Sequence, residues 1–124
     1  MIVDDSPDNL LLMRRLLESS GAKVTEANSV SEALAKLTKT KPDVLLTDIE
    51  MPNEDGYDLI EKIHHLSPEE GRDIPVAALT AHDREEDLRR LEDAGFAMKL
   101  SKPIDLQKTV AAVKELASKS RTFH

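Results

Sequence analysis

Apolar and polar positions follow two different periods along the chain. Short, mainly apolar runs occur at residues 1–3, 44–46, 74–79 and 98–100, and residues 23–27 alternate between polar and apolar side chains. Runs this short, bounded by Pro, Gly or acidic residues, predict strands, and the continuous ones predict strands buried on both faces of a parallel sheet. Between the runs, apolar residues recur every three or four positions, which predicts helices with one inward face.

Five helices are expected, each bounded by residues that start or stop a helix. The first runs from about residue 7 to 20, with Ser6 as its N-cap and Gly21 after its end. The second opens at a capping box formed by Ser29 and Glu32. The third helix is expected at about 57–66 and the fifth at 105–117. The fourth is expected to begin at a cap within 83–86 and to end at residue 94. A polar connection at 67–73 precedes the fourth strand.

The helical pattern also predicts which side chains face the core. In the first helix these are Leu12, Met13, Leu16 and Leu17, so Leu10 and Leu11 are expected outside the inward stripe. In the fourth helix they are Leu88, Leu91 and Ala94. In the last helix they are Leu106, Val110, Val113 and either Leu116 or Ala117.

The order of these elements defines the fold class. Strands that alternate with helices imply right-handed crossovers and a parallel sheet covered on both faces. We expect an α/β fold, a doubly wound five-stranded parallel sheet with five helices, in one domain over residues 1–118. Residues 119–124 are expected to form a disordered tail or linker remnant.

Composition excludes several functions. Hydrophobic residues make up 40% of the 124 residues and charged residues 33%, as in a soluble globular domain. The net charge of −7 and the aromatic share of 2% disfavour nucleic acid as a partner, because binding it needs basic patches or stacking rings. No apolar stretch approaches 18 residues, and Cys is absent. We therefore expect a cytoplasmic domain without membrane contact.

Polar residues follow four of the predicted strands at the point where each strand ends. They are Asp4 and Asp5, Asp48, Thr80, and Lys102. Because the carboxyl ends of parallel strands meet at one edge of the sheet, these side chains are expected to converge. Each alone is more often an ordinary solvated loop residue, but their joint placement indicates a site.

This set of residues favours phosphoryl chemistry. Crowded carboxylates repel one another unless a cation neutralises them, and an all-oxygen set suits Mg²⁺. A lysine and a threonine hydroxyl on the same rim provide one cation and one hydrogen-bond donor for a phosphoryl group, while an aspartate can act as the nucleophile. The sequence therefore predicts an aspartyl-phosphate site.

Five short motifs carry a resemblance to a known family. They are Val-Asp-Asp at 3–5, Thr-Asp-Ile-Glu-Met-Pro at 47–52, Asp-Gly at 55–56, Leu-Thr-Ala at 79–81 and Lys-Pro at 102–103. In these motifs, their order and their spacing, nearly the whole chain resembles the receiver domains of two-component response regulators. The resemblance implies a flavodoxin-like three-layer sandwich in which Asp48 accepts phosphate from a phosphohistidine.

The same resemblance implies the roles of the other site residues. Asp5, Asp48 and the backbone carbonyl of Glu50 would hold Mg²⁺, with Asp4 acting through water. Thr80 and Lys102 would contact the phosphoryl group, and the peptide bond between Lys102 and Pro103 would be cis. His82 and Glu50, each two residues after a site residue, would influence how water reaches the phosphoryl group.

Asn9 and the stretches 75–82 and 100–105 look most like receivers of hybrid histidine kinases and phosphorelays. The partner implied is a histidine kinase or a histidine phosphotransfer protein. The domain itself would be either part of a larger multidomain protein or a single-domain regulator. Such a domain is a signalling module, not an enzyme, apart from self-phosphorylation and slow autodephosphorylation. We expect Leu10 and Leu11 to form an apolar dock for the phosphotransfer partner.

Two features depart from the family pattern. Many receivers carry an aromatic residue three positions before the rim lysine, where this chain has Lys99, and only three residues precede Asp4.

An alternative function is a pseudo-receiver that is never phosphorylated and only binds proteins. A phosphatase with an aspartate nucleophile is less favoured, because its second aspartate is replaced here by Glu50.

Overall fold

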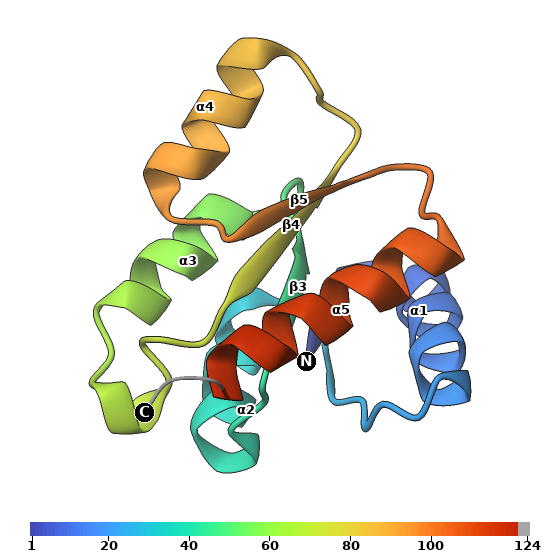
Figure 1. Cartoon of the computed structure of the whole chain (residues 1–124). Helices are drawn as coiled ribbons and strands as arrows, with labels where there is room; N and C mark the ends of the chain where they lie inside the picture. The colour runs from blue at the N-terminus through green and yellow to red at the C-terminus, as the bar shows by residue number, and fades with distance from the viewer. Residues whose placement is uncertain (122–124) are drawn as a thin grey trace.

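The fold is a five-stranded parallel sheet with helices on both faces, as the sequence predicts (Figure 1). The computed structural model describes the backbone of residues 1–121 and the side chains of residues 1–118. The strands are β1 (Ile2–Val3), β2 (Glu26–Ala27), β3 (Leu45–Asp48), β4 (Val76–Thr80) and β5 (Met98–Ser101), in the spatial order β2-β1-β3-β4-β5. The expected strand at 23–27 is paired only over its last two residues.

The described residues form five helices, of which four connect successive strands and the last follows β5. They are α1 (Pro7–Ser19), α2 (Val30–Thr40), α3 (Gly56–His64), α4 (Glu85–Ala94) and α5 (Leu106–Arg121). A 3₁₀ turn, η1 (Pro68–Glu70), lies in the polar connection before β4. Because α5 continues to Arg121, it extends beyond the end expected near residue 117. The rest of the expected tail, 122–124, lies outside the described residues.

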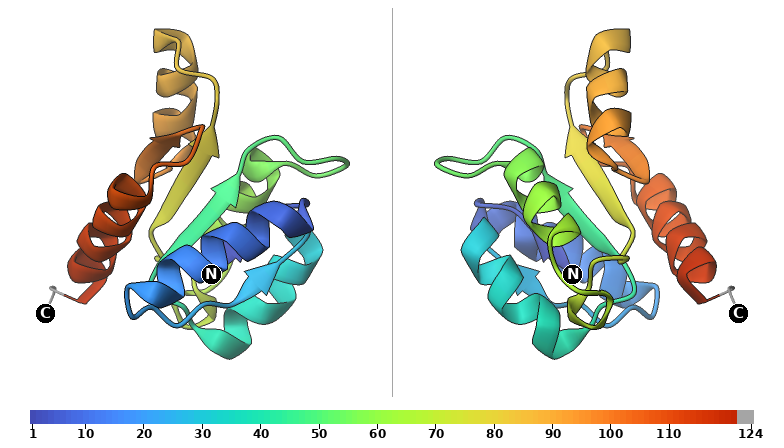
Figure 2. Two further views of the ribbon diagram at one scale, coloured as in Figure 1. Left: turned by 90° about the vertical axis from the view of Figure 1, so that its right-hand side faces the viewer. Right: turned by 90° about the vertical axis from the view of Figure 1, so that its left-hand side faces the viewer.

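The sheet separates two hydrophobic cores, and Figure 2 shows the helices that cover its two faces. On one face, Ile2, Leu46 and Leu79 pack with residues of α1 and α5. On the other face, side chains of β1, β3 and β4 pack with α2, α3 and the C-terminal half of α4. Because every residue of β3 and β4 is buried, these central strands provide a rigid platform for the loops that follow them.

The inward face of α1 differs from the expectation. Leu10, Met13 and Leu17 are buried, whereas Leu12 is 57% exposed and Leu11 47% exposed. The expected exposure of Leu10 and burial of Leu12 are therefore wrong. An unbroken apolar run from Leu10 to Met13 fits two stripes that differ by a small rotation of the helix, and packing against the sheet selects the one through Leu10.

The last two helices also depart from the predicted pattern. In α5 the buried residues include Thr109 and Ala112, while Leu106 is 50% exposed. Thr109 can be buried because its hydroxyl donates to the Asp105 carbonyl at 2.8 Å. In α4 only Leu91 is buried, and the N-cap is Arg84, without a side-chain hydrogen bond, instead of an acidic cap at 83–86.

Candidate functional site

The strand order reverses at β1, because the chain moves first to β2 on one side and then to β3 on the other. The loops that follow β1 and β3 therefore diverge at this point of the sheet edge, which is where open α/β sheets bind ligands. Asp4 and Asp5 follow β1, and Asp48 is the last residue of β3. The three acidic side chains are thus placed by the topology of the fold.

Asp48 is buried, and only 5% of its surface is exposed. Its Oδ1 accepts a hydrogen bond from Lys102 Nζ at 2.9 Å and a longer one from the Glu50 backbone N–H at 3.4 Å. Among the side chains that the structure describes, none donates a hydrogen bond to the other oxygen, Oδ2. One oxygen of Asp48 is therefore held, and the other remains open to a reactant.

Lys102 reaches Asp48 from the loop between β5 and α5. Its backbone N–H donates to the Thr80 carbonyl at 3.0 Å, which ties this loop to the end of β4. The peptide bond between Lys102 and Pro103 is cis, as the resemblance implied. The ammonium group of Lys102 lies 2.9 Å from Asp48 Oδ1.

Asp4 is buried, with 1% of its surface exposed. One carboxylate oxygen accepts from the Ser6 backbone N–H at 2.9 Å and the other from Asn9 Nδ2 at 3.3 Å. Burial and the nearby Asp48 carboxylate raise the pKa of Asp4, an effect that these two hydrogen bonds and Lys102 partly offset. The structure therefore holds an acidic group where its charge is unfavourable without a cation.

Asn9 was not predicted to support Asp4. Its place in the first turn of α1, directly above the loop that carries Asp4, is the signal in the sequence that could have identified this contact. Ser6 likewise has two functions, because its side chain caps α1 and its backbone N–H binds Asp4.

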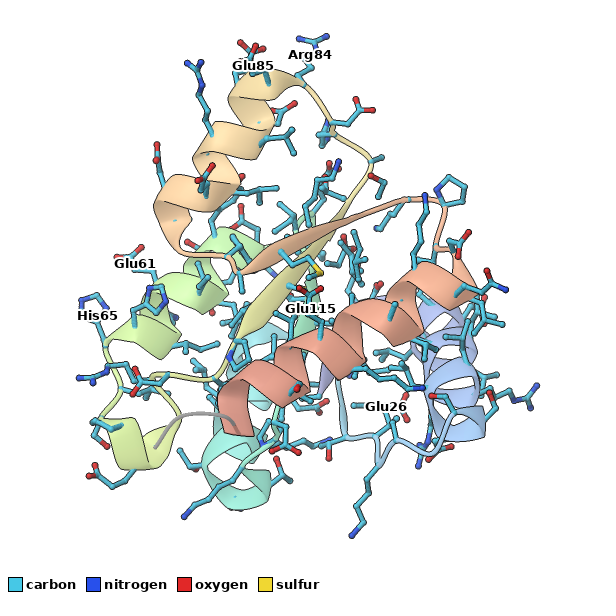
Figure 3. The ribbon with its side chains drawn as sticks, viewed as in Figure 1. Glu26, Glu61, His65, Arg84, Glu85 and Glu115 are labelled. Carbon is cyan, nitrogen blue, oxygen red and sulfur yellow. The ribbon has the colours of Figure 1, made fainter. Side chains whose placement is uncertain are left out.

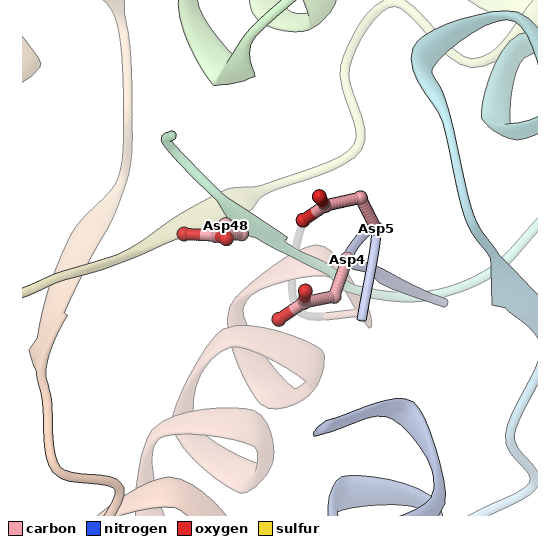
Figure 4. A group of neighbouring side chains, drawn as sticks. All are labelled: Asp4, Asp5 and Asp48. Carbon is pink, nitrogen blue, oxygen red and sulfur yellow. The ribbon is translucent and has the colours of Figure 1, made fainter. Parts of the chain in front are cut away.

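Asp4, Asp5 and Asp48 form a cluster in which one carboxylate oxygen from each residue lies within 4.8 Å of the others (Figure 4). Asp5 is exposed, so the cluster is open to solvent on one side. A set of three carboxylates with no nitrogen or sulfur ligand fits a hard divalent cation that keeps part of its water shell, such as Mg²⁺. The residues present therefore fit the Mg²⁺ that the resemblance implies.

Thr80 ends β4 one residue beyond Leu79, the partner of Asp48 in the sheet register. Its side chain is buried, and its hydroxyl oxygen accepts the backbone N–H of His82 at 3.0 Å. In the loops above, His82 Nε2 pairs with a carboxylate oxygen of Glu50, and both side chains are exposed. Contacts of Thr80 and His82 thus connect the loop after β4 with the loop after β3.

Gly56 allows the loop after β3 to fold back onto the strand. Its N–H donates to the Ile49 carbonyl at 2.9 Å. A Cβ atom at this position would lie 2.8 Å from the Asp48 carbonyl oxygen and 2.9 Å from the Ile49 Cα. Because these are backbone atoms next to the site, the turn requires glycine.

Lys99 occupies the position at which many receivers carry an aromatic residue. It pairs in register with Ala78, whose side chain belongs to the core on the α4 side of the sheet. Neighbouring residues in register point to the same face, so Lys99 faces α4. No aromatic ring is therefore present at this position to follow a movement of Thr80.

The family model described as the response regulator receiver domain matches residues 1–114. This chain belongs to that family.

Relatives and solved structures show which receiver domains this chain is similar to. An uncharacterized 14.6 kDa protein of Leptolyngbya boryana is 39% identical over 115 residues, which are 93% of this chain and 86% of the relative. The sensor histidine kinase RcsC of Escherichia coli (strain K12) is 36% identical over 98% of this chain, but the match spans only 13% of RcsC. The receiver domain of a signal transduction histidine kinase from Syntrophus aciditrophicus superposes with a TM-score of 0.87 at 29% identity, over 99% of this chain and 92% of that one.

The chain is thus similar to receiver domains of two-component signalling, including those that form one part of a much longer sensor kinase. Within the part of the chain that the structure describes, no helix is both long and apolar enough to cross a membrane.

Proposed function

We propose that Asp48 accepts a phosphoryl group from a phosphohistidine in a Mg²⁺-dependent reaction. The observation that carries this proposal is the environment of the Asp48 carboxylate. The Lys102 ammonium group contacts it, and two further carboxylates lie near it on the same rim. A purely protein-binding module would gain nothing from three repelling acids, so this arrangement favours a phosphoacceptor over a pseudo-receiver.

The reaction is a direct transfer. The open Oδ2 of Asp48 attacks the phosphorus atom, the bond from phosphorus to the imidazole nitrogen breaks, and the imidazole leaves as a neutral ring after taking a proton from solvent. Mg²⁺ bound by Asp5, Asp48 and the Glu50 carbonyl, with Asp4 acting through water, would neutralise charge on the transferred group.

After transfer, two residues of the rim hold the acyl phosphate. Lys102 exchanges its contact with Asp48 for an oxygen of the phosphoryl group, which lies within its reach. The Thr80 hydroxyl gives up the His82 N–H and turns to donate to a second oxygen. Water removes the group slowly, and the exposed pair of Glu50 and His82 limits its access.

Acetyl phosphate with Mg²⁺ tests this proposal without a protein donor. Intact mass measurement is expected to show one phosphoryl group on the wild type and none on Asp48→Asn. Asp83→Asn removes an exposed carboxylate from a loop at the same edge of the sheet and is expected to be labelled like the wild type. Undiminished labelling of Asp48→Asn would exclude the proposed acceptor.

The partner proposed is a histidine kinase or a histidine phosphotransfer protein, in a multidomain parent or beside a single-domain regulator. The exposed leucines of α1 are Leu11 and Leu12, so the dock proposed for this partner consists of these two residues and excludes the buried Leu10. Leu11→Ser with Leu12→Ser should slow transfer from the protein donor severalfold and leave labelling by acetyl phosphate unchanged. Equal slowing with both donors would mean that α1 supports the site and not the partner.

A further inference from the structure

A cavity of about 670 Å³ lies at the edge of the sheet opposite the proposed phosphoryl site. Residues 21–25, which lead into β2, form one wall, and residues 40–44, which lead into β3, form the other. Met1 lines the end of the cavity that faces β1. Figure 3 labels Glu26, the residue that follows the first wall, in the half of the molecule away from Arg84. The cavity is therefore separate from the site already described.

The walls of this cavity lead into the two strands between which β1 lies. Because the spatial order is β2-β1-β3, the cavity occupies the position of a strand ahead of Met1. The Ile2 N–H donates to the Thr25 carbonyl at 2.9 Å. On the other side, the Met1 ammonium group donates to the Val44 carbonyl at 2.8 Å. The backbones of Thr25 and Val44 therefore face each other across the line of β1.

Thr25 and Val44 also direct their N–H groups into the cavity, because the N–H and C=O groups of one residue in an extended chain point to the same side. Within the part of the chain that the structure describes, neither N–H group has an acceptor. In the register of β1, the last residue of an added strand would accept from Thr25, and the residue before it from Val44. Two donors without acceptors, one on each wall, thus favour an extended peptide as the occupant.

The charges around the cavity favour a carboxylate. Lys23 and Lys41 line it together with the Met1 ammonium group, and of the described residues that line it Asp43 alone is acidic. Burial lowers the pKa of the Met1 ammonium group to about 6, although Asp43 acts in the opposite direction. A further anion next to this group would therefore be stabilising. A strand that runs parallel to β1 ends next to Met1, so its terminal carboxylate can supply that anion.

One face of the cavity is apolar. Val24 and Val44 pack in the core on the side of α1 and α5, and Leu17 and Val113 line the cavity from these two helices. Side chains of a strand alternate between its two faces, so a residue two positions ahead of Ile2 faces the same core as Ile2. The last side chain of an added strand would therefore lie in apolar surroundings.

We propose that this cavity binds the C-terminal end of another polypeptide as one further strand, parallel to β1. Its terminal carboxylate lies between the Met1 ammonium group and the Thr25 N–H. Its last side chain is apolar and lies between Val24 and Val44. The residue before it accepts the Val44 N–H. Binding at this edge of the sheet does not depend on phosphorylation of Asp48.

A short peptide tests the proposal on the unmodified protein. The probe is acetyl-Thr-Lys-Ile with a free carboxyl end, titrated into isotope-labelled protein and followed by amide spectra. Saturable shifts are expected, the largest at the amides of Thr25 and Val44. The same peptide with a carboxamide end should bind about tenfold more weakly, because a charge-assisted contact is lost. Shifts centred on the exposed leucines of α1, or equal binding of the two peptides, would overturn the proposal.

Charge reversal on one wall provides a matched test. Lys23→Glu places an acid at the cavity and should weaken peptide binding severalfold. Lys39→Glu makes the same change on α2, outside the cavity, and should alter binding by less than about twofold. Equal effects of the two substitutions would mean that the peptide responds only to the net charge of the protein, and the assigned site would be wrong.

The remaining outcomes identify other occupants. Thr-Lys-Ile fused ahead of Met1 should fill the cavity and abolish binding of the free peptide. If this extension raises the melting temperature but the unextended protein does not bind the peptide, the cavity belongs to residues of the same chain and the proposal fails. If octanoate binds as tightly as the peptide, the cavity selects an amphiphilic anion instead of a strand, which also excludes the proposal.

Discussion

The rim that carries Asp48 and the N-terminal half of α4 are joined by the loop after β4 but are built in opposite ways. Asp48, Asp4 and Thr80 are buried, and each makes hydrogen bonds with neighbouring groups. Leu88 and the preceding loop are exposed, and the helix start lacks a side-chain cap. The chain thus combines a preorganised chemical site with an adjacent element that is weakly held.

This difference shows which part of the molecule is rigid and which part can change its conformation. Groups that must meet a phosphoryl group within hydrogen-bond distance are set on buried strands, because small displacements there would weaken transfer. The N-terminal half of α4 has few buried apolar contacts, so a small change in free energy is enough to move it. The expected effects below are ordered from the largest to the smallest.

Truncation of a leucine should have very different effects in the two regions. Leu46→Ala, in the buried strand β3, is expected to lower the free energy of unfolding by about 2–5 kcal/mol. Leu88→Ala is expected to lower it by less than about 0.5 kcal/mol, because this side chain is already partly in water. Urea unfolding of both variants measures the difference. Comparable losses would mean that the start of α4 is packed as firmly as the sheet.

The turn behind Asp48 should tolerate no side chain. Gly56→Ala places a Cβ against backbone atoms of Asp48 and Ile49, which should cost about 1–3 kcal/mol of stability and also weaken phosphorylation. Gly21 is the control, since its φ of +96° is strained for alanine but no atom lies within 4 Å of the added Cβ. Gly21→Ala should destabilise the protein without affecting labelling, and normal labelling of Gly56→Ala would argue against a role for this close approach.

Removal of the exposed member of the acid cluster should separate metal binding from folding. Asp5→Ala is expected to weaken Mg²⁺ binding by about tenfold or more and to impair phosphorylation. Without metal it should melt at the wild-type temperature or higher, because one of three repelling charges is gone. Asp83→Ala, at an exposed acid in the loop after β4, is the control for the loss of one negative charge. A lower melting temperature with unchanged metal affinity contradicts the assignment.

Asp4 should give the smallest effect and a defined pH dependence. Its pKa in the folded protein is raised above the ordinary value of 3.8, so the folded state binds this proton more tightly than the unfolded state does. The resulting stabilisation is fully present below 3.8 and is lost as the pH rises through the raised pKa.

Asp4→Asn, which carries no charge, should therefore gain stability relative to the wild type at pH 7 without metal, and this gain should disappear below the ordinary pKa. Unfolding curves at several pH values measure it. Mg²⁺ should reduce the gain, because it stabilises the wild type, with its three carboxylates, more than the variant with two. A pH-independent difference between the two proteins would mean that the Asp4 charge is not unfavourable in the folded state.

The sequence was sufficient to predict the sheet and the convergence of residues at its edge. Buried strands end where their apolar runs meet polar residues, and parallel strands must end at a common edge, so Asp4, Asp48 and Lys102 could be brought together without coordinates. The cap at Ser29 was equally predictable, because a capping box depends only on local spacing.

What the pattern could not settle was the rotation and tilt of helices. Leu10 and Leu12 are separated by two residues in a continuous apolar run, and only packing against the sheet decides which is buried. Leu88 belongs to the correct stripe but is exposed because α4 is attached at its other end. The bond from Asn9 to Asp4 likewise depends on how α1 sits above the β1 loop.

The central claim is that Asp48 itself carries the phosphoryl group, and borohydride reduction tests it most directly. Reduction converts an aspartyl phosphate to homoserine, which peptide mass spectrometry locates in the sequence. After treatment with acetyl phosphate and Mg²⁺, homoserine is expected at position 48 alone, and it should be absent when Mg²⁺ is removed with a chelator. Homoserine at position 4 or 5, or none in a protein that remains folded, would contradict the account.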